Sequence, residues 1–352
     1  MSNSASIQAG GLSFPYEDMP GYGEIIEIRD WLIWTRIPLP YRLDHVNVYL
    51  LRDGDGWAVI DTGIQTDEAI AVWEGLFAGP LAGKTITRVI ITHFHPDHIG
   101  LAGWMCDKFD AELLTSYSTF MGSRVISLGG HERMTRHTFD FYLQHGMTEE
   151  VAGVVAIQGN EYLRRVSDLP MLYRRLLLAD ILDIGGRTFR VLTGDGHAPE
   201  MVMLYCEEEG MLFAADQVLE KISPNVSVFT GEPNGDPLGH FLRSLRYMRS
   251  ELPGDLLVLP GHRRPFHGLH HRCAELEAHH EERCERIRKA CKEGPQSAAA
   301  LVPVLFPQKL DPHQMSFAFT ETLAHVNRLV RRGELKTIAT NGKFMTVTAT
   351  EG

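Results

Sequence analysis

The sequence contains no long apolar run. Nowhere in its 352 residues does it approach the ~18 consecutive apolar residues that a membrane-spanning helix requires. The first residues, MSNSASIQAGGLSFPYEDMPG, also lack the basic segment followed by an apolar segment that marks a secretory signal peptide. These two absences predict a cytoplasmic protein with no membrane partner.

Cysteine is scarce and carries no recognisable motif. The five cysteines are odd in number and widely spaced, and no C-x-x-C pair suggests a zinc knuckle or a redox centre. The G-x-S-x-G pattern of a serine nucleophile is absent too. We therefore expect reduced cysteines and a chemistry that does not use a covalent serine or cysteine nucleophile.

A surplus of positive charge is also missing. The formal net charge is −11, which repels polyphosphate at long range and makes nucleic acid an unfavourable partner. Hydrophobic residues make up 44% of the chain and charged residues 22%, as in ordinary globular proteins. A sizeable core can therefore form without disulfide bonds.

The N-terminal part of the chain alternates between strand and helix patterns. Residues 24 to 59 predict a β-meander with a tight turn at 53 to 56, and residues 66 to 77 predict a helix that is acidic at its start. A buried strand over 85 to 92 runs directly into His93, followed by a helix over 97 to 109 and a strand over 111 to 115. This alternation is typical of layered α/β proteins.

Beyond residue 115 the pattern changes. Residues 116 to 178 predict a mostly helical insertion, and three later segments, ILDIGGRTFRVLTGDG, MVMLYCEEEGMLFAAD and DLLVLPGH, predict strands that each end at a potential ligand. After Gly268 we expect three helices and then a hairpin over 336 to 348, with its turn at Asn341 and Gly342.

The segment THFHPDHIG carries the strongest chemical signal. It places His93, His95, Asp97 and His98 within six residues, and an extended turn can aim the first two imidazoles at one ion while the next pair faces another. Imidazole nitrogen and carboxylate oxygen suit zinc, and the same donors accept iron or manganese. Isolated histidines elsewhere are expected to be structural: His137, His145, His240, His279 and His280.

Together with VNVYLL, VIDTG, GDGHAPE, FAADQV and LPGH, this segment resembles the metallo-β-lactamase superfamily over approximately residues 25 to 270. The resemblance implies an α/β fold with four αββα layers. It also implies two divalent metal ions, with zinc favoured and iron or manganese as alternatives. The implied ligands are His93, His95 and His197 for the first ion, Asp97, His98 and His262 for the second, and Asp216 for both.

The same resemblance implies a mechanism. A hydroxide that bridges the two ions attacks the substrate carbonyl, with Asp97 and Asp216 as the catalytic carboxylates. Asp61, at the end of AVIDTG, is expected to orient a ligating imidazole through its other ring nitrogen, although a turn-capping role explains it as well.

Retention of Asp97, Asp216 and His262 resembles the glyoxalase II, thioesterase and lactonase branches, which implies a small acyl thioester, ester or lactone substrate. Lys221, Arg263 and Arg264 are candidates for binding an anionic arm of that substrate, with solvated surface as the alternative. The insertion offers apolar residues that suit either an acyl pocket or core packing: Met121, Met134, Phe139, Phe141, Tyr142, Leu143 and Met147.

The expected domain organisation has three parts: an N-terminal extension over 1–24, a catalytic domain over 25–270 that includes the insertion, and a C-terminal domain over 271–352. The last resembles a small winged-helix-like domain. Residues 273–352 contain eleven Lys and Arg against ten Asp and Glu, so packing or homodimer formation is preferred to nucleic-acid binding. Three alternatives stay open: an endoribonuclease, an iron-dependent oxygen or redox enzyme, and a silent binding protein on the same scaffold.

Overall fold

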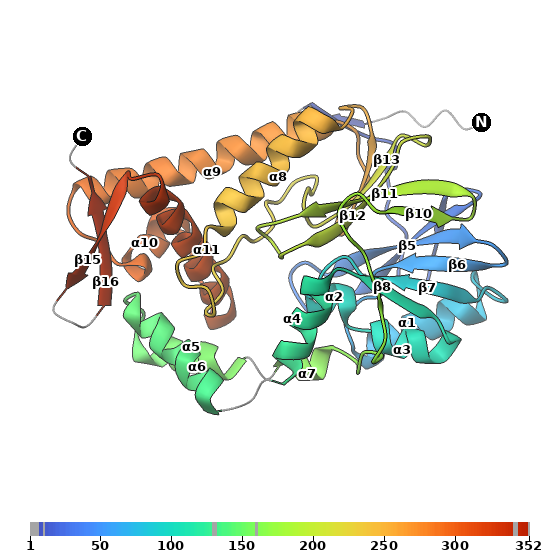
Figure 1. Cartoon of the computed structure of the whole chain (residues 1–352), viewed down its shortest axis with the longest axis horizontal. Helices are drawn as coiled ribbons and strands as arrows, with labels where there is room; N and C mark the ends of the chain where they lie inside the picture. The colour runs from blue at the N-terminus through green and yellow to red at the C-terminus, as the bar shows by residue number, and fades with distance from the viewer. Residues whose placement is uncertain (1–6, 10, 129–131, 159–160, 341–343, 351–352) are drawn as a thin grey trace. The chain divides into compact units, whose positions relative to one another are not determined.

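The computed structural model describes residues 7–9, 11–128, 132–158, 161–340 and 344–350 (Figure 1). The chain divides into two compact units. The first contains Met1–Ser127, Glu161–Pro224 and Arg249–Arg272, and the second contains Leu128–Asn160, Asn225–Met248 and Cys273–Gly352. The second unit thus combines the C-terminal region with two segments that the sequence-based boundaries place in the catalytic domain.

The first unit is built on two large sheets. One has the strand order β3-β4-β5-β6-β7-β8-β9, antiparallel from β3 to β6 and parallel from β6 to β9. Its strands span Ile26–Arg29 (β3), Leu32–Pro38 (β4), His45–Asp53 (β5), Gly56–Ile60 (β6), Ile86–Ile90 (β7), Glu112–Thr115 (β8) and Arg174–Arg175 (β9).

The second sheet has the order β10-β11-β12-β13-β14 and is antiparallel except for the parallel pair β13 and β14. Its strands span Ile181–Ile184 (β10), Arg187–Gly194 (β11), Met201–Cys206 (β12), Met211–Ala215 (β13) and Leu257–Pro260 (β14). A short hairpin near the N-terminus pairs Ile7–Ala9 (β1) with Leu12–Phe14 (β2).

The two sheets pack face to face, and helices cover the outer face of the seven-stranded sheet (Figure 1). The helices of this unit are Asp67–Ala78 (α1), Pro96–Ile99 (α2), Ala102–Phe109 (α3), Tyr117–Ser127 (α4) and Glu161–Arg165 (α7). One buried cluster, which includes Trp34, Tyr49 and Phe213, fills the space between the sheets. Burial of these large side chains supplies much of the driving force for the layered arrangement.

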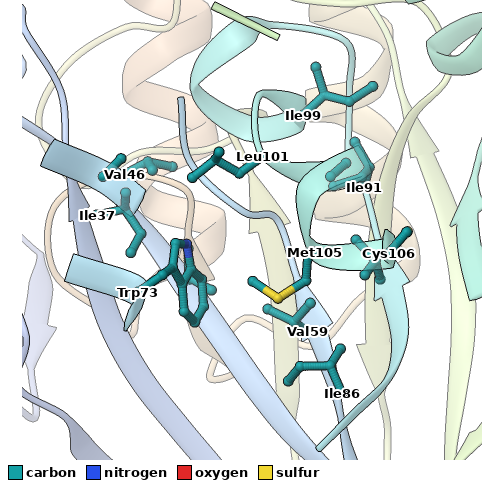
Figure 2. Packing of buried hydrophobic residues seen from close by; sticks show 14 of the residues in the cluster. Ile37, Val46, Val59, Trp73, Ile86, Ile91, Ile99, Leu101, Met105 and Cys106 are labelled. Atoms are coloured by element: carbon teal, nitrogen blue, oxygen red, sulfur yellow. The ribbon is translucent and has the colours of Figure 1, made fainter. Parts of the chain in front are cut away.

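A second cluster joins the seven-stranded sheet to its helices. Figure 2 shows Trp73 of α1 and Met105 of α3 facing Val59 and Ile86 of the sheet. Trp73 is fully buried, and its indole Nε1 donates a hydrogen bond to the Thr62 carbonyl oxygen at 2.8 Å. The segment after β6 is therefore fixed by both packing and a hydrogen bond.

The strands predicted up to residue 115 and the helix that follows Thr66 are confirmed, but the helix predicted over 97 to 109 is wrong in one respect. It is two helices, α2 and α3, separated at Gly100 and Leu101. A Cβ at Gly100 would approach the backbones of Gln65 and Arg165, and the Leu101 amide donates to the Gly63 carbonyl. Close contact with neighbouring segments interrupts the helix there.

The second unit consists of helices and a hairpin. Its helices are Glu132–Gln144 (α5), Glu149–Gln158 (α6), Pro237–Glu251 (α8), Leu269–Lys292 (α9), Ala298–Leu305 (α10) and Pro312–Arg331 (α11). The last residues of α8 and the first residues of α9 belong to the first unit. The hairpin pairs Leu335–Thr340 (β15) with Phe344–Ala349 (β16), and its predicted turn at Asn341 and Gly342 lies outside the described residues.

Helix α8 is absent from the sequence prediction. Its start nevertheless carries a recognisable signal, because Pro237 occupies the first turn and the carboxylate of Asp236 accepts a hydrogen bond from the Gly239 amide at 2.8 Å.

Within the described residues, no helix combines the length and the apolar character needed to cross a bilayer.

Three of the seven apolar residues predicted for the insertion pocket, Phe141, Tyr142 and Met147, are buried. The ring of Tyr142 stacks on Phe319 of α11 with 4.7 Å between centroids. Met121 and Met134 are exposed. Core packing in the second unit therefore explains Phe141 and Tyr142, and the predicted acyl pocket is not supported by these residues.

A buried polar cluster connects α9 and α11. His280 and His325 are fully buried, and the Nδ1 atom of His280 lies 3.1 Å from Nε2 of His325. The Nδ1 of His325 donates to the Glu321 carbonyl oxygen at 2.8 Å, while the Glu321 side chain forms an ion pair with Arg283. Burial lowers the pKa of His325 from 6.5 to about 3, so the ring is neutral near pH 7.

We predict that the burial of His325 makes the protein less stable in acid, because its ring resists protonation only in the folded state. Its pKa is lower in the folded state than in the unfolded state, so its stabilising contribution is complete above pH 6.5 and is lost as the pH falls towards 3. We expect His325→Gln to reduce the slope of unfolding free energy against pH, between pH 6.5 and 5, by up to about 1.4 kcal/mol per pH unit. Urea unfolding of the wild type and the variant at each pH gives the free energies of unfolding from which the two slopes are compared.

A control variant is needed because other groups also titrate between pH 6.5 and 5. Burial raises the pKa of Glu321 to about 7 although Arg283 lowers it, and this contributes a slope of opposite sign. The matched control is His313→Gln, which changes an exposed histidine at the start of the same helix and should leave the slope as in the wild type. Equal slopes in the two variants would contradict the prediction.

Candidate metal centre

Strand ends from both sheets of the first unit deliver the predicted site residues. The turn after β7 carries His93, His95, Asp97 and His98, with the last two in α2. The loops after β11, β13 and β14 carry His197, Asp216 and His262. All seven predicted ligands therefore belong to segments that begin where a buried strand ends, as the sequence indicated.

The side chains form two groups that share Asp216. Within each of the groups His93, His95, His197 and Asp97, His98, His262, the potential ligand atoms lie within 4.8 Å of one another. The Oδ2 atom of Asp216 is 3.5 Å from Nε2 of His197 and 3.3 Å from Nε2 of His262. Asp216 thus contacts a histidine of each group.

The cluster is shielded from solvent. His93, His98 and His262 are at most 1% exposed, whereas the side chain of Asp97 is 21% exposed. Asp97 also stays close to its group, with its Oδ2 atom 3.3 Å from Nε2 of His262. Of the two carboxylates, Asp97 is therefore the one more accessible to water or to a bound molecule.

Asp61 lies beside His98, one of the predicted ligands. Its Oδ1 accepts a hydrogen bond from the Thr92 amide at 2.9 Å, and its Oδ2 accepts one from the Thr92 hydroxyl at 2.8 Å. Nδ1 of His98 lies 2.7 Å from the same Oδ2 atom. Because the Nδ1 side of His98 is held by Asp61, its Nε2 atom faces Asp97 and Asp216 in the cluster.

His262 is oriented in the same way by the backbone. Its Nδ1 donates to the His45 carbonyl oxygen at 2.7 Å, which leaves Nε2 facing Asp97 and Asp216. The His45 ring, whose pKa burial lowers to about 4, accepts a hydrogen bond at Nε2 from the Arg263 amide at 3.1 Å. The polar residues of β5 therefore fix the loop that carries His262.

Two more residues of β5 hold this loop. The side-chain amide of Asn47 donates to the carbonyl oxygens of Pro260 and Arg263 at 2.9 and 2.7 Å, and the Tyr49 hydroxyl donates to the Pro260 carbonyl oxygen at 2.9 Å. Both side chains are buried. The alternation of polar residues in HVNVY was the available sequence signal, but it did not distinguish this role from that of sheet surface.

A contact that the sequence did not reveal holds the His197 loop. The Glu200 carboxylate accepts hydrogen bonds from the Ser118 amide and hydroxyl, at 3.2 and 2.5 Å, and the Glu200 amide donates to Asp195 at 3.1 Å. Ser118 lies in the first turn of α4, so the loop is tied to a helix 82 residues earlier in the chain. No local pattern predicts such a pairing.

The backbone next to the cluster is strained. Asp61, Ala215 and Arg263 have φ values of 58°, 45° and 70°, a left-handed region that is unfavourable for residues other than glycine. Asp61 supports His98, Ala215 precedes Asp216 and Arg263 follows His262. The surrounding hydrogen bonds and packing compensate for the cost of these three backbone conformations.

Charges divide the cluster into two electrostatic types. Burial, together with the neighbouring histidines, lowers the pKa of His93 well below 6.5 and that of His95 to about 3. Burial alone would also lower the pKa of His262, but Asp216 and Asp97 raise it to about 10. Burial would raise the pKa of Asp216, yet His262 and His98 hold it well below its usual range.

The donor set fits metal cations. Nε2 of His98 and Oδ1 of Asp216 are buried and have no hydrogen-bond partner among the described residues. Buried polar atoms without partners are costly, and a cation between them would satisfy both. Five imidazoles and two carboxylates in two overlapping groups are the donors that zinc, iron and manganese accept.

The three predicted substrate contacts differ in their surroundings. Lys221 is exposed. Nε of Arg264 lies 3.2 Å from Oε2 of Glu220, and its guanidinium covers the Phe14 ring at 4.1 Å. In contrast, Nε of Arg263 is buried and has no hydrogen-bond partner in the described part of the chain. Arg263 is thus the one of these three residues with a buried donor that lacks a hydrogen-bond partner among the described residues.

Comparisons with known proteins agree with this geometry. Residues 41–262 match the family model described as the metallo-beta-lactamase superfamily, and residues 284–344 match the metallo-beta-lactamase-like C-terminal domain. The chain is 24% identical over 322 residues to "Probable metallo-hydrolase YqjP" of Bacillus subtilis, covering 85% of this chain and 92% of that protein.

Two solved structures are similar over nearly the whole chain. A beta-lactamase domain protein from Burkholderia ambifaria is 38% identical with a TM-score of 0.89, covering 96% of this chain and 98% of its own. A metallo-beta-lactamase family protein from Thermus thermophilus is 30% identical with a TM-score of 0.78, covering 92% of this chain and 100% of its own. The predicted fold class is confirmed.

Gly261 is predicted to be essential for the shape of the cluster. A Cβ at this position would overlap Oδ1 of Asp216 and lie 2.9 Å from Cε1 of His98. We expect Gly261→Ala to displace both side chains and to weaken zinc affinity at least about tenfold, measured by competition with a chromophoric chelator. Gly75→Ala, at a helical position with nothing within 4 Å, is the matched control. Unchanged affinity in Gly261→Ala would refute the prediction.

Asp61→Asn tests the orienting role of the carboxylate. An amide can still accept from the Thr92 amide, but it cannot accept from both the Thr92 hydroxyl and Nδ1 of His98 as the carboxylate does. We expect a loss of zinc affinity of about 10- to 100-fold. Asp55→Asn, in the exposed turn between β5 and β6, should bind zinc as the wild type does. If both variants bind equally well, Asp61 has no orienting role.

Proposed function

Because the chain belongs to the metallo-β-lactamase superfamily, we propose that it is a dinuclear metal-dependent hydrolase of an acyl thioester, ester or lactone. The observation that carries the proposal is the pair of three-residue groups, each with two buried members, that share Asp216. Such a pair of sites is what a two-metal hydrolase requires.

In this proposal His93, His95 and His197 hold one divalent ion, Asp97, His98 and His262 hold the other, and Asp216 contacts both. Zinc is the preferred ion, with iron or manganese as alternatives that the same donors accept. When bound, two such ions polarise a carbonyl and lower the pKa of water from its bulk value towards about 7.

The protein's own side chains complete the chemistry. Asp97 is the more accessible carboxylate, so its oxygen atoms are placed to orient water and to accept or return a proton. The buried histidines and Asp61 keep their positions through hydrogen bonds that need no rearrangement during turnover. Exclusion of water from the rest of the cluster strengthens every electrostatic interaction with a developing oxyanion.

A covalent cysteine mechanism is not supported. All five cysteines are buried. Burial raises the pKa of the Cys106 and Cys284 thiols to about 12 and that of Cys291 to about 11, so these groups are not thiolates near neutral pH. A hydrolytic attack by water is therefore favoured over formation of an acyl-enzyme.

Arg263 supports an anionic arm on the substrate. It follows His262 directly, and its buried Nε donor lacks a hydrogen-bond partner among the described residues. A guanidinium with such an unsatisfied donor can form a charge-assisted hydrogen bond to a carboxylate or a phosphate. Substrates such as an acyl-glutathione or an acyl-coenzyme A carry these groups, consistent with the glyoxalase II and thioesterase branches.

We also propose that the C-terminal region is a winged-helix-like domain. Its role is packing or the formation of a homodimer. The order of α9, α10 and α11 followed by the hairpin of β15 and β16 supports this assignment. Its nearly balanced charge, and the net charge of −11 for the whole chain, do not favour a nucleic-acid substrate.

The test combines metal analysis with a hydrolysis screen. Purified protein should contain about two zinc ions per chain and hydrolyse at least one of acyl-coenzyme A, acyl-glutathione, lactone or aryl-ester substrates. Asp97→Ala should lower that activity by more than about 100-fold. Asp107→Ala, which changes an exposed carboxylate in α3, should retain it.

Each other outcome overturns a definite part of the proposal. Cleavage of RNA without ester turnover would replace the substrate class with a phosphodiester. Iron together with oxygen consumption would replace hydrolysis with redox chemistry. Full ester turnover in Asp97→Ala would remove that residue from the mechanism.

A further inference from the structure

The second unit contains a pocket that shares no residue with the metal cluster. Its volume is about 330 Å³. One side is formed by a face of α11 and the other by the hairpin of β15 and β16, which packs beside that helix (Figure 1). This volume is at the lower end of the range for small-molecule sites, roughly 300–1,000 Å³.

Six of the twelve residues that line the pocket are aliphatic. Helix α11 contributes Leu323, Val326 and Val330, which recur at spacings of three and four and therefore share one face of the helix. Strand β16 contributes Met345 and Val347. None of the described lining residues is aromatic apart from His145, so the wall suits a flexible hydrocarbon chain better than a flat ring.

One end of the pocket is polar and positively charged. The side-chain amide of Asn327 donates to the carbonyl oxygens of Pro233 and Gly235 at 2.9 and 2.8 Å. Nη2 of Arg331 donates to the Asn234 carbonyl oxygen at 3.0 Å. The loop over 233–235 thereby holds Arg331 and Asn327 at the same edge of the pocket.

The charge of this end is not neutralised by the described residues. No carboxylate among them lines the pocket, and no ion pair involves Arg331 in that part of the chain. His145 also lines the pocket, but its Nδ1 donates to the Phe141 carbonyl oxygen at 2.8 Å and burial lowers its pKa, so it adds no charge near pH 7. A single guanidinium beside an aliphatic wall is complementary to an anion with a hydrocarbon tail.

We propose that this pocket binds a small aliphatic carboxylate, with its chain between α11 and the hairpin and its carboxylate on the guanidinium of Arg331. Each methylene group occupies roughly the volume of a water molecule, about 30 Å³, so the pocket accommodates a chain of roughly eight to ten carbons. The proposal is independent of the reaction at the metal centre, because no residue is common to the two sites.

Calorimetric titration of the full-length protein with octanoate tests the proposal. We expect saturable binding that Arg331→Gln weakens about tenfold or more, because a charge-assisted hydrogen bond is lost. Arg243→Gln, which changes an exposed arginine of α8 that does not line the pocket, is the matched control and should bind as the wild type does. The neutral analogue 1-octanol should bind at least about tenfold more weakly than octanoate.

A second pair of variants separates the pocket from the metal centre, since carboxylates also bind metal ions. Val326→Trp fills the pocket and should abolish octanoate binding, with circular dichroism used to verify folding. Asp216→Ala should retain it. Loss of binding in Asp216→Ala with retention in Arg331→Gln would assign octanoate to the metal centre and overturn the proposal. Absence of saturable binding in the wild type would overturn it as well.

Discussion

The burial of Asp216, together with the partial burial of Asp97, among five histidines is the constraint on which the first unit depends. A buried carboxylate without partners is costly, and Asp216 is stabilised by His98, His197 and His262, each of which has a ring nitrogen within 3.5 Å of it. Keeping those imidazoles in place requires further partners, Asp61 for His98 and the His45 carbonyl for His262. Each of these partners is itself held by a strand end or by a hydrogen bond from the backbone. The two sheets are therefore the support that allows the charged cluster to stay buried.

Much of this arrangement could be predicted from the sequence because the relevant signals are local. Buried strands are short apolar runs, and a strand that ends at His93 or Asp216 places a polar side chain at the edge of a sheet. The spacing in THFHPDHIG is likewise contained within one turn. Asp61 could be recognised for the same reason, since it follows β6 directly.

Features that depend on tertiary contacts could not be predicted. The separation of α2 from α3 follows from the approach of Gln65 and Arg165 to Gly100, residues that lie 35 and 65 positions away in the chain. The pairing of Ser118 with Glu200 spans 82 residues. The insertion was correctly predicted to be helical, yet its apolar residues gave no indication that Tyr142 stacks on Phe319 of the C-terminal region. Hydrophobic pattern predicts that a face is buried and not which partner covers it.

The two buried histidine clusters of this protein show why residue type alone does not define a metal site. His280, Glu321 and His325 also bring three potential ligand atoms within 4.8 Å of one another. There, however, the Glu321 carboxylate is already paired with Arg283, and the two imidazoles are joined by a hydrogen bond, so the guanidinium supplies the positive charge that a metal ion would bring. In the first unit no lysine or arginine pairs with Asp97 or Asp216 in the described residues, and buried donor atoms remain without hydrogen-bond partners. The absence of a competing fixed cation, more than the number of histidines, is what makes the first cluster suitable for metal ions.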